Sequence, residues 1–179
     1  MAKQYQPSKK HSTDALINPE AKIMPLDQLL ERAREWRHQA MTIVFTNGCF
    51  DLLHVGHVTL LDQARREGHC LVVGINSDKS VRELKGPTRP IVAEHARARV
   101  LAALSAVDAV VIFNEPTPLN LMLALRPDVI VKGGDYNAEC IIGSNEVQSW
   151  GGKVKIINYL DGFSTTQLIT QATAQKKSS

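Results

Sequence analysis

The chain has 179 residues, of which 44% are hydrophobic and 22% are charged, a composition typical of one ordinary globular domain and not of a disordered or fibrous chain. The formal net charge is +3, but the excess lies in the terminal segments, so the near-neutral remainder disfavours a nucleic-acid partner except through those tails. No apolar run approaches membrane-spanning length and residues 1–10 lack an apolar signal core, so we expect a cytoplasmic protein with no membrane partner. The three cysteines are widely spaced and form no Cys-x-x-Cys pattern, which favours reduced thiols.

The N-terminal segment is polar, which predicts a mobile tail over residues 1–22. One domain then covers residues 23–175, and residues 176–179 form a short C-terminal tail. Between Pro25 and Gln39 apolar residues recur at helical spacing. This spacing predicts an amphipathic helix on the outside of the domain.

From residue 41 onward, short apolar runs rich in Val and Ile alternate with stretches of helical spacing. The runs cover residues 41–46, 70–75, 109–113, 129–132 and 154–157. The helical stretches cover residues 56–67, 93–105, 118–125 and 145–150, and a last one starts at residue 165. Because the runs lack polar alternation, we expect strands that are covered on both faces. The pattern predicts an α/β fold with a Rossmann-like, open, parallel, five-stranded sheet and helices on both faces, and ligands bind such sheets at the carboxyl ends of the strands.

The loop after the first strand contains His54-Val55-Gly56-His57 at the start of a helix. The chain contains neither Gly-x-Gly-x-x-Gly nor a P-loop, so any phosphate-binding device is a different one. His54 and His57 are three residues apart and can share a helix face, while Gly56 lets a ligand approach the backbone. A helix N-terminus favours anions, and two imidazoles can donate hydrogen bonds to phosphoryl oxygens. Helix capping by His54 and a metal-binding pair are the alternatives, and the lack of a nearby third ligand disfavours the metal.

The segment after the second strand, residues 79–99, carries six basic residues against two acidic ones. A polyanionic substrate explains this excess, and an ordinary solvated loop is the alternative. Lys85 and Arg97 are the preferred phosphate contacts, with Lys79 as a third candidate.

Two further segments follow strand ends. The fourth strand leads into Lys132-Gly133-Gly134-Asp135, where paired glycines permit a base or sugar to lie close to the backbone and Asp135 can accept a hydrogen bond. After the fifth strand, Ser164, Thr165 and Thr166 precede a helix, where hydroxyl and amide groups can bind an oxyanion. A plain turn and plain helix capping are the corresponding alternatives.

The His-x-Gly-His element and residues 163–166, Phe-Ser-Thr-Thr, resemble the two signatures of the cytidylyltransferase-like nucleotidyltransferases, with Phe163 at a position usually occupied by Ile. Residues 45–51, 85–87 and 126–136 resemble more narrowly the adenylyltransferases of ADP-heptose synthesis, over roughly residues 26–169. Such domains often follow a sugar kinase, and the length here suggests a stand-alone form.

This resemblance implies transfer of AMP from ATP to D-glycero-β-D-manno-heptose 1-phosphate, giving ADP-heptose and pyrophosphate for the lipopolysaccharide core. It implies Mg²⁺ bound with ATP and not by protein side chains, and a homodimer or higher homo-oligomer. The alternatives are a glycerol-3-phosphate cytidylyltransferase and a nucleotide-binding regulator without turnover. The cytidylyltransferases carry Arg-Thr-x-Gly before their Ser-Thr-Thr, whereas residues 159–162 here are Tyr-Leu-Asp-Gly.

The resemblance also assigns site residues. Catalytic roles fall to His54, His57, Lys85 and Arg97. The sugar phosphate would be bound by Lys85 and Arg97, and the sugar hydroxyls by Asp51. The nucleotide pocket would comprise Thr46, Asn47, Gly48, Cys49, Phe50, Gly56, Lys132, Gly133, Gly134, Asp135, Ser164, Thr165 and Thr166.

Overall fold

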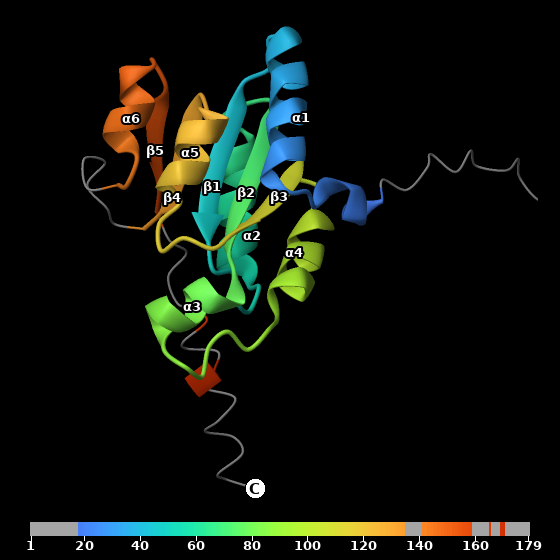
Figure 1. Cartoon of the computed structure of the whole chain (residues 1–179), viewed down its shortest axis with the longest axis vertical. Coiled ribbons are helices and arrows are strands. Elements are labelled where there is room, and N and C mark those ends of the chain that lie inside the picture. Colours follow the sequence, from blue (N-terminus) through green and yellow to red (C-terminus); the bar gives the residue numbers. More distant parts are fainter. Residues whose placement is uncertain (1–17, 135–140, 159–164, 166–168, 171–179) are drawn as a thin grey trace, which may run out of the picture.

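A computed structural model describes residues 18–134, 141–158, 165 and 169–170 of the chain. Its strands are β1 (Ile43–Gly48), β2 (Cys70–Asn76), β3 (Ala109–Phe113), β4 (Val129–Gly133) and β5 (Lys153–Ile157). They form one five-stranded sheet in the order β3-β2-β1-β4-β5, in which every pairing is parallel (Figure 1). The predicted α/β class and the five-stranded parallel sheet are confirmed.

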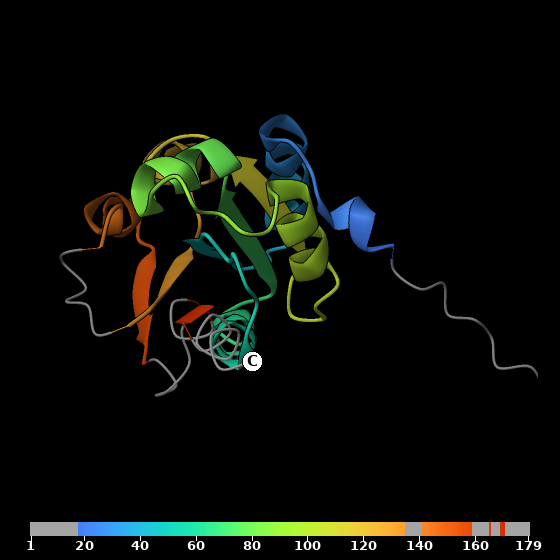
Figure 2. The ribbon, with the colours of Figure 1, turned by 90° about the horizontal axis from the view of Figure 1, so that it is seen from below.

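Helices cover both faces of this sheet. They are the 3-10 helix η1 (Pro19–Lys22) and the α-helices α1 (Leu26–His38), α2 (Val55–Arg65), α3 (Asp78–Lys85), α4 (Glu94–Ala102), α5 (Leu119–Leu125) and α6 (Ser144–Ser149). One apolar core joins the sheet to α1, α5 and α6, and a second joins the opposite face to α2 and α4 (Figure 2). Alternation along β1 creates the two cores, since Phe45 packs in the first and Val44 in the second.

The edge strand β5 differs from the prediction that all strands are covered on both faces. Lys153 and Lys155 are exposed, and the residues between and after them are partly or fully buried. This alternation follows from the position of β5 at the sheet edge, where Lys155 reaches Glu67 at 3.3 Å instead of packing in a core.

The end of the predicted N-terminal tail belongs to the folded domain. Residues 19–22 form η1, and Lys22 Nζ donates hydrogen bonds to the carbonyls of Leu104 and Val107, at 3.2 and 2.7 Å. Ile23 pairs with Val110 beside the sheet. The predicted tail therefore extends too far into the domain. In the sequence Lys22 resembles the other polar residues of the tail, because the carbonyls that it binds are distant along the chain. Residues 1–17 and 176–179 of the predicted tails lie outside the described residues, as do residues 171–175 of the predicted domain.

Helix α3 is absent from the predicted helical stretches, which leave residues 76–92 unassigned. Ser77 is its N-cap, with its hydroxyl accepting from the amide of Ser80 at 3.2 Å, and Asp78 lies in the first turn. Both are ordinary start signals that could have revealed the helix. Within the described residues no helix is long and apolar enough to cross a membrane.

Candidate active site

The strand order reverses between β1 and β4. From β1 the chain moves through β2 to β3 on one side and then returns to β4 on the other side of β1 (Figure 1). In open parallel sheets this reversal opens a crevice at the carboxyl ends of the strands, where ligands bind. The residues after β1 and β4 border this crevice, so the sequence-predicted segments around His57 and Lys132 meet there.

His54 and His57 form a stacked pair at the start of α2. Their ring centroids lie 3.8 Å apart with planes 27° from parallel. His54 is the N-cap residue, but its side chain makes no capping hydrogen bond, which disfavours the capping alternative. The Nδ1 atoms of both rings are buried without a hydrogen-bond partner among the described residues. Buried polar atoms are rarely left unpaired unless a ligand or water uses them.

The surroundings of both histidines favour the neutral imidazole at physiological pH. Burial lowers the pKa of His57 to about 4, with the neighbouring His54 adding to the effect and the Leu52 carbonyl opposing it. Burial also lowers the pKa of His54. A neutral imidazole keeps one N–H, so each ring can donate a hydrogen bond without carrying a charge.

Phe50 shapes the wall beside the histidine pair. Its φ is 48°, in the left-handed region that non-glycine residues seldom adopt, and its buried ring lies 5.1 Å from that of His57. The ring also covers Gly48, where an added Cβ would come within 3.1 Å of Phe50 Cε2. Gly48 therefore allows the aromatic ring to pack against the strand end.

Asp51, predicted to bind sugar hydroxyls, is held by protein groups. Its side chain is 1% exposed, and its carboxylate pairs with Arg89 Nε at 2.5 Å. The same carboxylate accepts from the amides of Ile91 and Val92 at 2.8 and 2.9 Å. Since protein donors occupy both oxygens, Asp51 fixes the loop before α4 to the end of β1. The sequence places Asp51 in the loop after β1 but does not show these hydrogen-bond partners.

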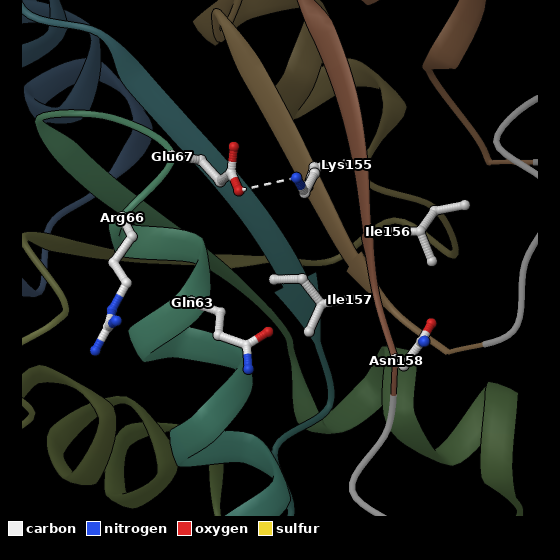
Figure 3. Close-up of a pocket in the computed structure, with 7 residues that line it drawn as sticks. All are labelled: Gln63, Arg66, Glu67, Lys155, Ile156, Ile157 and Asn158. Atoms are coloured by element: carbon white, nitrogen blue, oxygen red, sulfur yellow. Dashed lines mark ion pairs between the residues drawn. The ribbon is translucent and has the colours of Figure 1, made fainter.

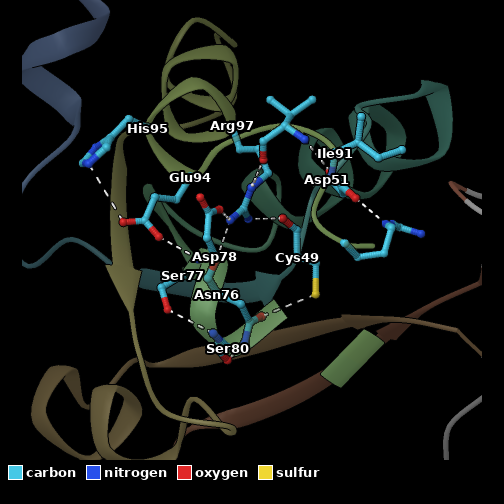
Figure 4. A network of polar contacts seen from close by, with 12 residues as sticks. Cys49, Asp51, Asn76, Ser77, Asp78, Ser80, Ile91, Glu94, His95 and Arg97 are labelled. Carbon is cyan, nitrogen blue, oxygen red and sulfur yellow. Dashed lines mark hydrogen bonds and ion pairs between the residues drawn. The ribbon is translucent and has the colours of Figure 1, made fainter. Parts of the chain in front are cut away.

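Arg97, a predicted phosphate contact, is also held by protein groups. Its side chain is fully buried, and Figure 4 shows it at the centre of a polar network. Nε donates to the Val92 carbonyl at 2.9 Å and Nη1 to the Cys49 carbonyl at 2.5 Å. Nη2 donates to the Asn76 carbonyl and to Asp78, both at 2.8 Å. Arg97 thus joins the ends of β1 and β2 to the start of α4 and has no exposed surface for substrate.

Two of the predicted cations, Lys79 and Lys85, lie on α3 and are exposed, and neither has an ion-pair partner in the part of the chain that the structure describes. Lys85 is the last residue of the helix. Burial raises the pKa of the Cys49 thiol, whereas Lys85, Arg97 and Arg89 act to lower it. These three cations therefore surround the end of β1, and Arg89 is a member that the sequence analysis missed.

On the other side of the crevice, Lys132 Nζ donates to Asn47 Oδ1 at 2.6 Å. The two glycines that follow continue beside β5, with the Gly134 amide donating to the Ile157 carbonyl at 2.9 Å. Gly134 has φ 127°, which a side chain would strain. Asp135, Ser164 and Thr166 lie outside the described residues.

Two hydroxyl residues complete the described site. Thr165 Oγ1 lies 3.4 Å from the Leu52 carbonyl, so this one described residue of the second predicted signature lies beside the loop that carries the histidines. Thr46 Oγ1 is buried without a partner among the described residues. Among those residues, no group of three His, Cys, Asp or Glu side chains could hold a metal ion.

A separate groove lies between α2 and β5. It is lined by Gln63, Arg66, Glu67, Lys155, Ile156, Ile157 and Asn158 (Figure 3). The ion pair between Glu67 and Lys155 lies in this groove, and none of the sequence-predicted site residues lines it.

Comparison with known proteins agrees with this architecture. Residues 45–178 match the model of the cytidylyltransferase-like family, and the chain belongs to that family. It is 58% identical over 166 residues to the bifunctional protein HldE of Koribacter versatilis, covering 93% of this chain and 34% of that protein. The corresponding protein of Methylobacillus flagellatus is 57% identical over 148 residues, covering 83% of this chain and 30% of that protein. The chain thus spans about a third of the length of these curated relatives.

Solved structures show the same fold. The lipopolysaccharide core biosynthesis protein of Thermoplasma volcanium is 28% identical with a TM-score of 0.54, covering 67% of this chain and 97% of that one. The pantoate-beta-alanine ligase of Francisella tularensis is 15% identical with a TM-score of 0.57, covering 82% of this chain and 74% of that one. The second likeness concerns the fold alone.

Proposed function

We propose that the chain transfers AMP from ATP to D-glycero-β-D-manno-heptose 1-phosphate, giving ADP-heptose and pyrophosphate. The observation that carries this proposal is the stacked pair His54 and His57 at a helix start in the crevice of a cytidylyltransferase-like domain, whose Nδ1 atoms are buried without a partner among the described residues. The choice of acceptor rests on the motif resemblance. The 58% identity to a bifunctional HldE protein and the likeness to a lipopolysaccharide core biosynthesis protein support it.

The reaction needs positioning and charge stabilisation more than a base. A sugar phosphate has a second pKa of about 6, so at pH 7 its oxygen is already anionic and can attack the α-phosphorus of ATP. The new P–O bond forms as the bond to pyrophosphate breaks. The N–H groups of His54 and His57 would donate to the phosphoryl oxygens, whose charge grows during transfer. Mg²⁺ would enter with the triphosphate as part of the substrate.

The remaining residues divide into ligand contacts and positioning residues. Lys85 would contact the triphosphate or the sugar phosphate, and the segments 132–135 and 164–166 would line the nucleotide pocket. Asp51 and Arg97 would act by positioning, because protein groups already occupy them. From the family resemblance we also propose a cytoplasmic homodimer. Light scattering on the purified chain tests whether it is a dimer.

Pyrophosphate release tests the function directly. ATP and CTP, each with Mg²⁺, would be offered with heptose 1-phosphate and with glycerol 3-phosphate. The proposal expects release only from ATP with the heptose. Release from CTP with glycerol 3-phosphate would move the chain to the glycerol-3-phosphate cytidylyltransferases, from which residues 159–162 already depart. Absence of release in all pairings, with nucleotide still bound, would favour a binding regulator.

A further inference from the structure

Lys132 is an inward-facing ammonium group at the point where the strand order reverses. It lies on β4, which pairs with β1 in the middle of the sheet, and its side chain turns toward Asn47 at the end of β1. Nζ lies 2.6 Å from Asn47 Oδ1 and 3.4 Å from the Asn47 carbonyl. Both acceptors are neutral, and within the described ranges Lys132 has no carboxylate partner.

The surroundings of Lys132 disfavour its charge. Burial lowers the pKa of Lys132 to about 8, and the Cys49 thiol is the titratable group whose negative form would oppose this. Cys49 is itself held protonated by burial, with Lys85, Arg89 and Arg97 beyond it. Lys132 is partly buried, and a partly buried cation without a counter-ion is disfavoured, whereas an anion placed beside it stabilises the charge. Asn47 fixes the position of the ammonium group, because its amide oxygen accepts a hydrogen bond from Nζ.

We propose that Lys132 binds a phosphoryl oxyanion of the substrate, and that this binding draws a proton onto Lys132. The inference rests on the proposed function for its ligands, and it adds a proton-coupled recognition step at a named atom. Either the nucleotide or the sugar phosphate can supply the oxyanion, so each is titrated separately.

The coupling predicts a measurable proton uptake. A group that titrates near pH 8 and becomes fully charged in the complex takes up about half a proton per ligand at pH 8 and almost none at pH 6.5. Other groups contribute little at pH 8. The sugar phosphate is already a dianion there. The pKa values of the two histidines are lowered, so both are neutral at pH 8. The pKa of the Cys49 thiol is raised, so it is already protonated.

Isothermal titration calorimetry at pH 8 in HEPES and in Tris measures this uptake, because the buffers differ in ionisation enthalpy. The ligands are a magnesium complex of non-hydrolysable α,β-methylene-ATP and, separately, heptose 1-phosphate. For the ligand that contacts Lys132, Lys132→Met should weaken binding about 10- to 100-fold, the usual range for a lost charged hydrogen bond, and abolish the uptake. Lys132→Arg should retain binding within a few-fold without uptake, because arginine stays charged.

Lys155→Met is the matched control. Lys155 lies on the neighbouring strand β5, is exposed and pairs with Glu67, so affinity and uptake should equal those of the wild type. Uptake that persists in Lys132→Met, or unchanged affinity for both ligands in that variant, would overturn the inference. If the Met variant does not fold, binding with undiminished uptake in Lys132→Arg would overturn it equally. Lys132-dependent binding and uptake in a chain that releases no pyrophosphate would support the inference and overturn the proposed function.

Discussion

Two clusters of buried polar groups lie at the carboxyl ends of the strands and differ in whether their polar atoms have hydrogen-bond partners. Around Arg97, carbonyl and carboxylate oxygens from the ends of β1 and β2 and from the loop before α4 accept its N–H groups. At the start of α2, the Nδ1 atoms of His54 and His57 are buried without partners among the described residues. We interpret the first cluster as a scaffold, whose polar groups bind one another, and the second as the proposed ligand site, whose unpaired atoms a ligand can bind.

The difference between the clusters predicts opposite consequences of mutation. Removing a member of the first cluster leaves its buried partners without a hydrogen bond, which lowers the stability of the fold. In the second cluster the Nδ1 atoms have no partner among the described residues to leave behind, and the His57 ring has only the Leu52 carbonyl as a backbone partner, so the loss should appear mainly in catalysis. The following predictions test this division in order of expected effect.

Arg97→Met should lower the free energy of unfolding by about 3–5 kcal/mol, because it leaves Asp78 and three carbonyls without their donor. Urea denaturation measures the change. Arg99→Met on the same helix is the control, since Arg99 is exposed and pairs only with exposed Glu20 among the described residues, a contact worth about 1 kcal/mol or less. If both variants lose the same small amount, the Arg97 network is not a scaffold.

His57→Ala should lower kcat about 100-fold, or roughly 3 kcal/mol of transition-state stabilisation, because a donor to the phosphoryl oxygens is lost. Its free energy of unfolding should change much less than that of Arg97→Met. Steady-state pyrophosphate release measures kcat, with His69→Ala as control, since His69 is exposed and accepts from the Thr42 amide. Near-normal turnover in folded His57→Ala would contradict the catalytic role.

Acid pH should destabilise the wild type partly through the same histidine. The pKa of His57 is lowered to about 4 in the folded chain from 6.5, so between these values the unfolded chain binds more protons. Stability is therefore retained above pH 6.5 and falls as pH is lowered toward 4. His57→Asn should reduce this loss by about 1–2 kcal/mol between pH 7 and 4.5, measured by denaturation at each pH. Parallel pH profiles for the two proteins would refute the attribution.

The same division explains which features the sequence could predict. The strands and the histidine loop are local patterns. Short apolar runs were enough to predict the strands, and the position of His54 and His57 after the first run was enough to place the loop at the carboxyl ends of the strands. The role of Arg97 depends on acceptors up to 48 residues away, at Cys49, and no local pattern distinguishes a buried arginine from a solvated one. Asp51 is similar, because its partners lie 38 to 41 residues further along the chain. Counting charges along the sequence therefore does not distinguish a cation held by protein groups from one exposed to solvent.

Thr46→Val is the most delicate test of the comparison, because it removes one unpartnered hydroxyl and keeps the shape of the side chain. Thr46 is 1% exposed on β1, and its Oγ1 has no partner among the described residues. Loss of an unsatisfied hydroxyl should leave the free energy of unfolding unchanged or raise it by up to about 1 kcal/mol. If the hydroxyl serves the ligand, kcat/KM should fall by about 10-fold, the effect of one neutral hydrogen bond. Lower stability with unchanged kcat/KM would instead make Thr46 part of the scaffold, so that lack of a partner would no longer mark a ligand contact.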